Sequence, residues 1–287
     1  ISAGSCIMET PHTQLRCVTV EGVGVGHTWT LIIDALAGSS SPGIFDYLKP
    51  VISSITCISG CTNGNLQTAG GSVIRLTGTN LGPNDSESTP VLFYERSQML
   101  YNASSCSLQS AHTSMQCVMR PGVGKDFSLQ VSIGKQLGSV FSSNLRYEAA
   151  TIARVVSEKL RTDAASNAQS IQIRGSNFGP TGRPQDVRVL YGSQENYEAR
   201  DCAVITADTT ISCEHVSGVG ESLPVKIILG NDDDVLAPND ETLSYRSPSI
   251  IAIDGATQMS TVGGETVRIR GENFGPLGTT VRAFYGI

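Results

Sequence analysis

The sequence predicts an all-β protein built from tandem β-sandwiches, and three observations carry this prediction. The hexapeptide Gly78–Pro83 (Gly-Thr-Asn-Leu-Gly-Pro) returns in similar form at 175–180 and 271–276, a period of about 97 residues. Apolar and polar residues alternate along short segments such as 127–133, which is typical of a strand with one face in a core. The 287 residues include 30 glycines and 12 prolines, which indicates many tight turns.

The repeat also predicts the order of elements within each unit. A first strand has Ile52, Ile152 or Ile250 as its first apolar residue, and an alternating second strand runs into the glycine turn. A further strand, a pair of cysteines, a Gly-Val-Gly turn and an alternating strand follow, and a tyrosine closes the unit at Tyr47, Tyr147 and Tyr245. Roughly seven short strands per unit favour a sandwich.

These markers divide the chain into two complete and two half units. We expect complete domains at 49–148 and 149–247, the second half of a domain at 1–48, and the first half of a domain at 248–287. Half a sandwich cannot bury its own core. We therefore expect the half units to belong to a longer array or to be completed by neighbouring copies.

The eight cysteines predict the compartment. Three pairs share a spacing of eleven residues and a fourth is a short C-x3-C: Cys6/Cys17, Cys106/Cys117, Cys202/Cys213 and Cys57/Cys61. The repeated spacing predicts four local disulfides and an extracellular or luminal protein of the secretory pathway. A metal site would need the ligands clustered, whereas these pairs lie far apart and the four histidines do not complete them. We expect no cofactor.

Charge and hydropathy exclude two further classes. With 20 basic and 26 acidic residues the net charge is −6, so the basic surface that a nucleic-acid partner requires is missing. No apolar stretch approaches the eighteen or so residues that span a bilayer.

The order of motifs resembles the IPT/TIG domain, the immunoglobulin-like module of plexins, scatter-factor receptors, fibrocystin-like proteins and Rel-type transcription factors. The resemblance covers essentially the whole chain. It lies in Gly70-Gly71 through Pro83, in Gly263-Gly264 through Pro276, and in a Val-x-Phe-Tyr strand followed by the cysteine pair. It implies immunoglobulin-like sandwiches, and the cysteines and negative charge favour the extracellular members over the DNA-binding ones. The unit at 149–247 lacks the Gly-Gly, so its second strand is expected to enter differently.

Candidate catalytic residues fail the tests of spacing. His12, His112 and Asp208 occupy one repeat position between the two cysteines, which indicates a polar turn. No Gly-x-Ser-x-Gly or His-Glu-x-x-His motif occurs, and we expect no enzymatic activity. Gly22–Gly26 resembles a phosphate loop but leads into a strand rather than a helix, so we interpret it as a turn that supplies positive φ. Trp29 falls on the inward-facing set of the next strand.

Two kinds of surface site remain as candidates. An acidic cluster at Asp232, Asp233 and Asp234 is a weak calcium candidate, because carboxylates ligate calcium but the spacing matches no known loop. Solvated turn residues are the alternative. Asn84-Asp-Ser and Asn102-Ala-Ser are sequons in expected loops and predict N-linked glycans.

The interpretation is an extracellular structural or adhesive protein, a stiff strut within a surface fibre or filament whose partners are further copies of itself or of the same array. The alternative is the ligand-binding or stalk region of a plexin-like or fibrocystin-like receptor. The closing tyrosine and the first apolar residue of the next strand are five apart at every boundary. The four residues between them reach at most about 14 Å, and Pro50 and Pro248 stiffen two boundaries.

Overall fold

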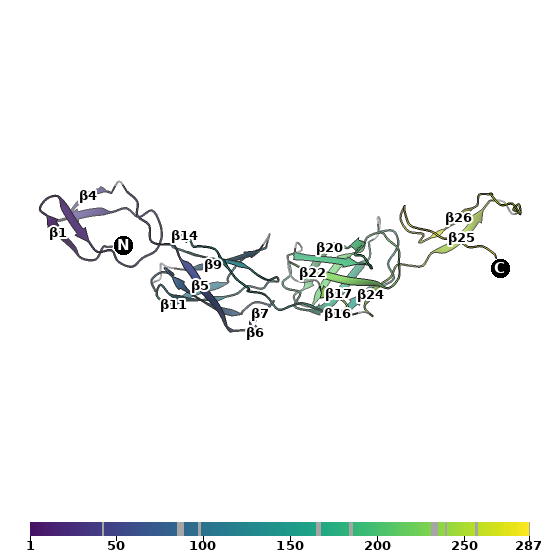
Figure 1. The fold of residues 1–287 in the computed structure, drawn as a ribbon, viewed down its shortest axis with the longest axis horizontal. Coiled ribbons are helices and arrows are strands. Elements are labelled where there is room, and N and C mark those ends of the chain that lie inside the picture. Colours follow the sequence, from purple (N-terminus) through teal and green to yellow (C-terminus); the bar gives the residue numbers. More distant parts are fainter. Residues whose placement is uncertain are drawn as a thin grey trace. The chain divides into compact units, whose positions relative to one another are not determined.

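The computed structural model describes residues 1–41, 43–84, 89–96, 99–164, 168–183, 186–230, 235–238, 240–255 and 258–286. No α-helix occurs among these residues, so the chain is all-β (Figure 1). It falls into two compact units, Ile1–Glu148 and Ala149–Ile287, which are described separately. Within the described ranges, no helix is long and apolar enough to cross a membrane.

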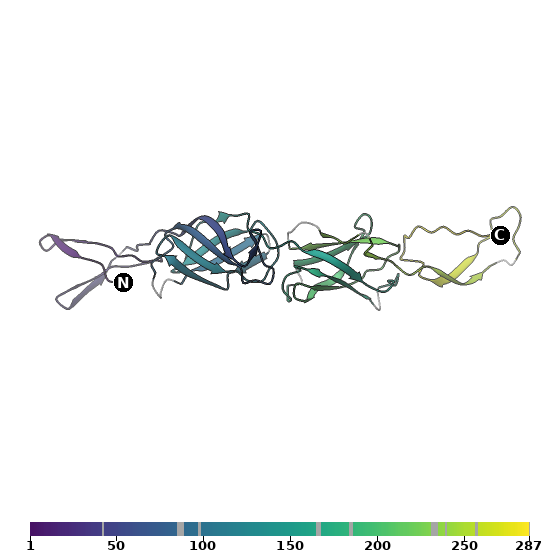
Figure 2. The ribbon, with the colours of Figure 1, turned by 90° about the horizontal axis from the view of Figure 1, so that it is seen from below.

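Residues 49–148 form a two-layered sandwich (Figures 1 and 2). Its strands are β5 (Val51–Ser59), β6 (Cys61–Thr62), β7 (Asn65–Leu66), β8 (Val73–Thr79), β9 (Val91–Arg96), β10 (Met99–Asn102), β11 (Ser105–Ser110), β12 (Ser114–Val118), β13 (Ser128–Ile133), β14 (Gln136–Leu137) and β15 (Phe141–Ser142). One sheet has the order β11-β12-β8-β5. The other has the order β10-β9-β13-β14, with β15 also paired to β13, and β6 and β7 form a small ribbon.

The core of this sandwich follows from the alternation of apolar residues along its strands. Leu129, Val131 and Ile133 on β13 are 0%, 1% and 2% exposed, while the residues between them are half-buried. Tyr94 and Phe127 are also fully buried, and their rings meet edge to face at 5.5 Å. The period-two pattern thus places one face of each strand in the core.

Residues 149–247 repeat this arrangement. The strands are β16 (Thr151–Val156), β17 (Ser170–Ser176), β18 (Val187–Tyr191), β19 (Tyr197–Glu198), β20 (Arg200–Thr206), β21 (Thr210–Glu214), β22 (Leu223–Leu229), β23 (Val235–Leu236) and β24 (Thr242–Leu243). The sheets have the orders β16-β17-β21-β20 and β19-β18-β22-β23, with β24 paired to β22. The structure is therefore that of tandem immunoglobulin-like β-sandwiches.

The remaining strands form isolated hairpins. Residues 1–48 hold β1 (Cys6–Thr10) paired with β2 (Gln14–Cys17), and β3 (Thr30–Ile33) paired with β4 (Leu36–Ser40); residues 248–287 hold β25 (Ser249–Asp254) paired with β26 (Arg268–Glu272). Leu31 and Ile33 are 43% and 54% exposed, although their counterparts Val131 and Ile133 are buried. The strands that would face them belong to the other half of a repeat, so these apolar faces stay open.

The structure contains four disulfides, and they join the pairs Cys6–Cys17, Cys57–Cys61, Cys106–Cys117 and Cys202–Cys213. Cys6 and Cys106 lie directly opposite Cys17 and Cys117 in antiparallel hairpins, with Cα atoms 4.0 and 4.1 Å apart. The eleven-residue spacing is therefore two strands and a tight turn. Four disulfides support an extracellular location.

Candidate functional site: the joints between repeats

Each repeat is closed by a tyrosine whose hydroxyl bonds back to the loop after the cysteine hairpin. The Tyr147 hydroxyl donates to the carbonyl of Arg120 at 2.7 Å, and the Tyr245 hydroxyl donates to that of Val216 at 2.7 Å. Tyr47 makes the same bond to Val20 at 2.9 Å. In the complete domains a second tyrosine completes the pair, with Tyr94 2.9 Å from Tyr147 and Tyr191 3.0 Å from Tyr245 between hydroxyl oxygens.

Burial controls the protonation of three of these hydroxyls, those of Tyr94, Tyr191 and Tyr245. Burial raises the pKa of Tyr94 to about 12. Burial likewise raises the pKa of Tyr191 and of Tyr245. The phenolate would lose its hydration inside the sandwich, so each ring stays neutral and its hydroxyl remains available for the closing bond.

The Gly-Val-Gly turn uses its two glycines for different reasons. The third position has positive φ in all copies, at 102° for Gly24, 104° for Gly124 and 126° for Gly220. The first glycine does not. A Cβ at Gly122 would lie 2.8 Å from the Tyr147 ring, and one at Gly218 would lie 2.7 Å from that of Tyr245. Our sequence interpretation invoked positive φ alone, and the first glycine instead makes room for the closing tyrosine.

A tyrosine from the edge strand holds the valine of this turn in the complete domains. The Tyr197 hydroxyl donates to the carbonyl of Val219 at 2.9 Å and accepts from its amide at 3.1 Å. Tyr101 makes the matching pair with Val123, at 3.4 and 3.3 Å. The valine is therefore held at a fixed place on the end of the sandwich.

The asparagine of the Gly-x-Asn-x-Gly-Pro turn anchors the linker that precedes its own domain. Asn80, Asn177 and Asn273 all have positive φ, at 57°, 60° and 60°. Their side-chain amides donate to the backbone carbonyls of Lys49, Ala149 and Ser247, at 3.2, 3.0 and 3.3 Å. Each of these carbonyls lies two residues after a closing tyrosine, so only one residue separates the two anchored points.

The joint between residues 1–48 and the following domain lies inside the first compact unit. Val23 packs at Gly82 and Gly134, where added Cβ atoms would lie 3.0 and 2.7 Å from its methyl groups. The buried Gln136 donates from its side-chain amide to the Tyr47 carbonyl at 2.7 Å. An apolar contact and a buried hydrogen bond therefore both connect residues 1–48 to the following domain.

A surface ion pair adds to this joint. Nε2 of His112 lies 2.9 Å from Oε2 of Glu21, and both side chains are exposed. Exposed pairs of this kind contribute about 0–1 kcal/mol. The apolar contact and the buried amide are the larger contributions.

The second unit contains an equivalent joint. Val219 contacts Gly275, and these residues occupy the repeat positions of Val23 and Gly82. A side chain at Gly275 would overlap Val219, and its φ of 88° is a second reason for glycine there. The valine of the Gly-Val-Gly turn therefore contacts the same glycine of the next repeat in both joints.

The histidines fall in structural positions. His12, His112 and Asp208 have φ values of 64°, 61° and 61° and form the turn between the paired cysteines. His215 is fully buried. Its Nδ1 accepts from the amide of Gln169 at 2.7 Å, and its Nε2 lies 3.0 Å from the carbonyl of Arg161.

In the repeat at 149–247, which lacks the Gly-Gly, His215 bonds to Gln169 beside that position. In the other complete domain the equivalent residue is Met119, whose backbone bonds to Gly71 and Ser72. The backbone amide of His215 likewise donates to the carbonyl of Gln169 at 3.1 Å, and its imidazole adds bonds to the Gln169 amide and the Arg161 carbonyl. Sequence reasoning noted the different entry of this strand but did not connect it to His215.

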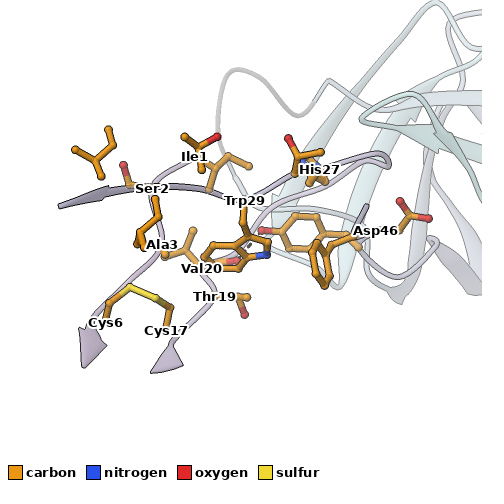
Figure 3. Close-up of a pocket in the computed structure, with 16 residues that line it drawn as sticks. Ile1, Ser2, Ala3, Cys6, Cys17, Thr19, Val20, His27, Trp29 and Asp46 are labelled. Carbon is orange, nitrogen blue, oxygen red and sulfur yellow. Dashed lines mark hydrogen bonds between the residues drawn. A yellow bond between two sulfur atoms is a disulfide. The ribbon is translucent and has the colours of Figure 1, made fainter. Parts of the chain in front are cut away.

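The open face of residues 1–48 contains a hollow of about 830 Å³ (Figure 3). Trp29 lines it between the Cys6–Cys17 disulfide and Asp46, and its ring meets Phe45 edge to face at 6.4 Å. Trp29 is 38% exposed, whereas Leu129 and Val225 at the same repeat position are buried. The hollow marks the place that a facing sheet fills in the complete domains.

The surface candidates are placed as follows. Asn84 is exposed in a bend, and Asn102 is half-buried at the end of the edge strand β10. The acidic cluster Asp232, Asp233 and Asp234 lies outside the described residues. Within the part of the chain that is described, no group of three or more His, Cys, Asp or Glu side chains is arranged to hold a metal ion.

The sequence alone did not predict two sets of joint residues. These are the asparagines that anchor the linkers, Asn80, Asn177 and Asn273, and the valines that contact the next repeat, Val23 and Val219. Their recurrence at one position of every copy was the available signal. Recurrence shows that a residue is used, but only the packed structure shows what it touches.

Comparison with known proteins gives fold-level likeness only. No family model matches the chain, and no curated protein matches it. Among solved structures it is similar to the surface glycan-binding protein PbSGBP-B of Prevotella bryantii (14% identity, TM-score 0.39, 67% of this chain and 42% of that one). It is also similar to SGBP-B from a xyloglucan utilization locus of Bacteroides uniformis (13%, 0.27, 75% and 58%). A third similar structure is the plexin A4 extracellular region (12% identity, TM-score 0.28, 78% of this chain and 28% of that one). The chain spans less than two thirds of each of these proteins.

Proposed function

We propose that this chain is a non-enzymatic extracellular strut of tandem IPT/TIG domains that works within a larger surface fibre or filament. The observation that carries the proposal is the anchored linker. Asn80 and Asn273 hold the linker carbonyls of Lys49 and Ser247, two residues after tyrosines that are themselves hydrogen-bonded into the preceding repeat. A linker with one residue between anchors has few conformations left, in contrast to flexible Gly/Ser linkers.

The repeated joint supports the same proposal. Val23 at Gly82 and Val219 at Gly275 place the same contact in each compact unit. A contact that recurs between successive repeats favours a regular relation between successive domains, which in turn favours repeated contacts with further copies. Adhesion through such copies, and N-linked glycans at Asn84 and Asn102, belong to the proposal.

The test removes only the anchoring amides. Glycine adopts positive φ freely, so Asn80→Gly, Asn177→Gly and Asn273→Gly together should keep the turns and free the linkers. Asn63→Gly is the matched control, because Asn63 also has positive φ (52°) but lies in the β6–β7 turn. Particle images and small-angle scattering of the 287-residue chain would give the spread of angles between neighbouring repeats.

We expect a narrow spread for the native chain and the control, and a broad one for the triple variant. Native repeats that bend freely, with unrelated angles from one joint to the next, would overturn the strut and favour a receptor stalk.

A further inference from the structure

The outer face of the sheet β10-β9-β13-β14 in residues 49–148 has exposed apolar side chains. Leu100 and Leu137 point outward and are 58% and 47% exposed. Phe93 lies between them, half-buried. A hollow of about 220 Å³ lies over this face, lined by Phe93, Glu95, Leu100, Ser128, Gln130 and Leu137.

The equivalent face of residues 149–247 is covered by charged side chains. Arg188 pairs with Glu198 at 2.8 Å, and Lys226 pairs with Glu195. Leu190, at the repeat position of Phe93, is only 7% exposed beneath them. The aliphatic stems of such long side chains cover apolar surface while their charged ends stay in water. The two domains thus differ in what covers the same sheet.

The positions of these ion pairs are occupied differently in the first domain. Cross-strand pairing aligns Asn102 with Glu198, Val91 with Arg188 and Gln130 with Lys226. Neither Val91 nor Gln130 is charged, so no ion pair can form there. The position of Glu198 instead holds the asparagine of a sequon, Asn102-Ala103-Ser104.

The register brings Asn102 beside Phe93. They are directly paired across β10 and β9, and Gln130 of β13 is the next residue in the same row. The neighbouring pair is hydrogen-bonded, because the amide of Ala103 donates to Leu92 at 2.9 Å. Asn102 and Phe93 therefore form a non-hydrogen-bonded pair, in which side chains on one face approach most closely.

We propose that Asn102 carries an N-linked glycan whose first sugar ring packs on Phe93 and covers this hollow. A sugar ring presents C–H groups on one face, and these suit the electron-rich face of an aromatic ring. Ser128, Gln130 and Glu95 lie around Phe93 and offer hydrogen-bond partners to the sugar hydroxyls and acetamide. A sugar ring therefore suits both the apolar and the polar side chains that line the hollow.

The glycan is attached by a transferase of the secretory pathway. A bond forms between Nδ2 of Asn102 and C1 of the first sugar, while the bond from C1 to the diphosphate of a lipid-linked oligosaccharide breaks. The diphosphate leaves with the electron pair, and the amide gives up one proton to the enzyme. Ser104 is exposed and completes the sequon. This inference depends on the extracellular location and not on the strut.

The test uses the full chain secreted from a eukaryotic host. Glycopeptide mass spectrometry would report occupancy of Asn102, and NMR would report contacts between the sugar acetamide methyl and the Phe93 ring. Two backgrounds are compared, native and Ser104→Ala, which loses the sequon but keeps Asn102. Phe93→Ala is introduced into each, and hydrogen exchange of β9 and β10 is measured.

We expect Phe93→Ala to reduce protection roughly 2- to 10-fold more with the glycan than without it, the size of an aromatic contact. Asn84→Gln, which removes the other sequon in an exposed bend, should leave this coupling unchanged. An occupied Asn102 without ring contacts or coupling would overturn the packing. An unglycosylated Asn102 in a chain with all four disulfides would overturn the site and leave the strut untouched.

Discussion

The two complete domains, residues 49–148 and 149–247, have the same sheets but differ in how they satisfy the same positions. Met119 in the first is replaced by the buried His215 in the second, and the apolar Phe93 face is replaced by one covered with ion pairs. Both keep the closing tyrosine pair and the hairpin disulfide. The comparison teaches that the strand framework needs the tyrosines and cysteines, while loops and outer faces accept different chemistry.

The largest effect is expected from exchanging the buried residue that distinguishes the domains. His215→Met leaves the Gln169 amide and the Arg161 carbonyl without their imidazole partner. Both bonds are part-buried, and each group left without a partner costs about 1–3 kcal/mol, so the domain should lose about 2–6 kcal/mol. Hydrogen exchange of β17 and β21 in the full chain measures this loss.

Met119→Leu is the matched control, because it conserves volume and should cost less than about 1.5 kcal/mol. If His215→Met were equally mild, the imidazole would not be what holds the loop before β17.

Removal of the hairpin disulfides should destabilise the two complete domains by similar amounts. Replacing Cys106 and Cys117 by alanine should destabilise one domain, and replacing Cys202 and Cys213 the other, by about 3 kcal/mol each in the chain-entropy picture. The Cys57–Cys61 bridge closes a shorter loop and should contribute about 2 kcal/mol. Denaturant unfolding, followed by hydrogen exchange of the strands in each domain, would measure these losses of unfolding free energy. Unequal losses from the two hairpin pairs would mean that their surroundings, and not loop closure, determine the effect.

The closing tyrosines should respond alike. Tyr147→Phe and Tyr245→Phe each remove a hydroxyl that bonds both a loop carbonyl and a second tyrosine, and each should cost about 1–3 kcal/mol. Tyr285→Phe serves as the control, since Tyr285 is 91% exposed and should change nothing measurable. A loss confined to one domain would show that the hydroxyl of the closing tyrosine stabilises that domain alone.

The smallest effect concerns alkaline pH. Burial raises the pKa of Tyr94 to about 12 from its ordinary value of 10.0, so the folded state retains a proton that the unfolded state releases. Its contribution to stability should be complete below pH 10 and be lost as pH rises from 10 through 12. Tyr191 and Tyr245 have raised pKa values for the same cause, so the second domain should follow the same sign.

Denaturant midpoints at pH 9 and pH 11 measure this slope. Tyr94→Phe should flatten it in residues 49–148 and leave the other domain unchanged. A slope that persists in the variant would assign the alkaline loss to another group.

Much of the fold was predictable because its signals are local. Alternation along 127–133 predicted a half-buried strand, and β13 has that pattern of burial. The common position of His12, His112 and Asp208 predicted a turn, and all three have positive φ. The eleven-residue spacing predicted the cysteine partners because both lie in one hairpin. The joints were predictable only in length, since Asn80 and Lys49 meet across 31 residues.

The sequence by itself therefore determined the repeat, the strand pattern, the turns and the local disulfides, because each depends on spacing within a few tens of residues. The tertiary structure decided which residues from distant segments share a face. The cross-strand register places Asn102 beside Phe93 and His215 beside Gln169, and the packing of one repeat on the next brings Val23 to Gly82. The physical reason is that periodicity specifies which way a side chain points, whereas its partner depends on which strand is folded against it.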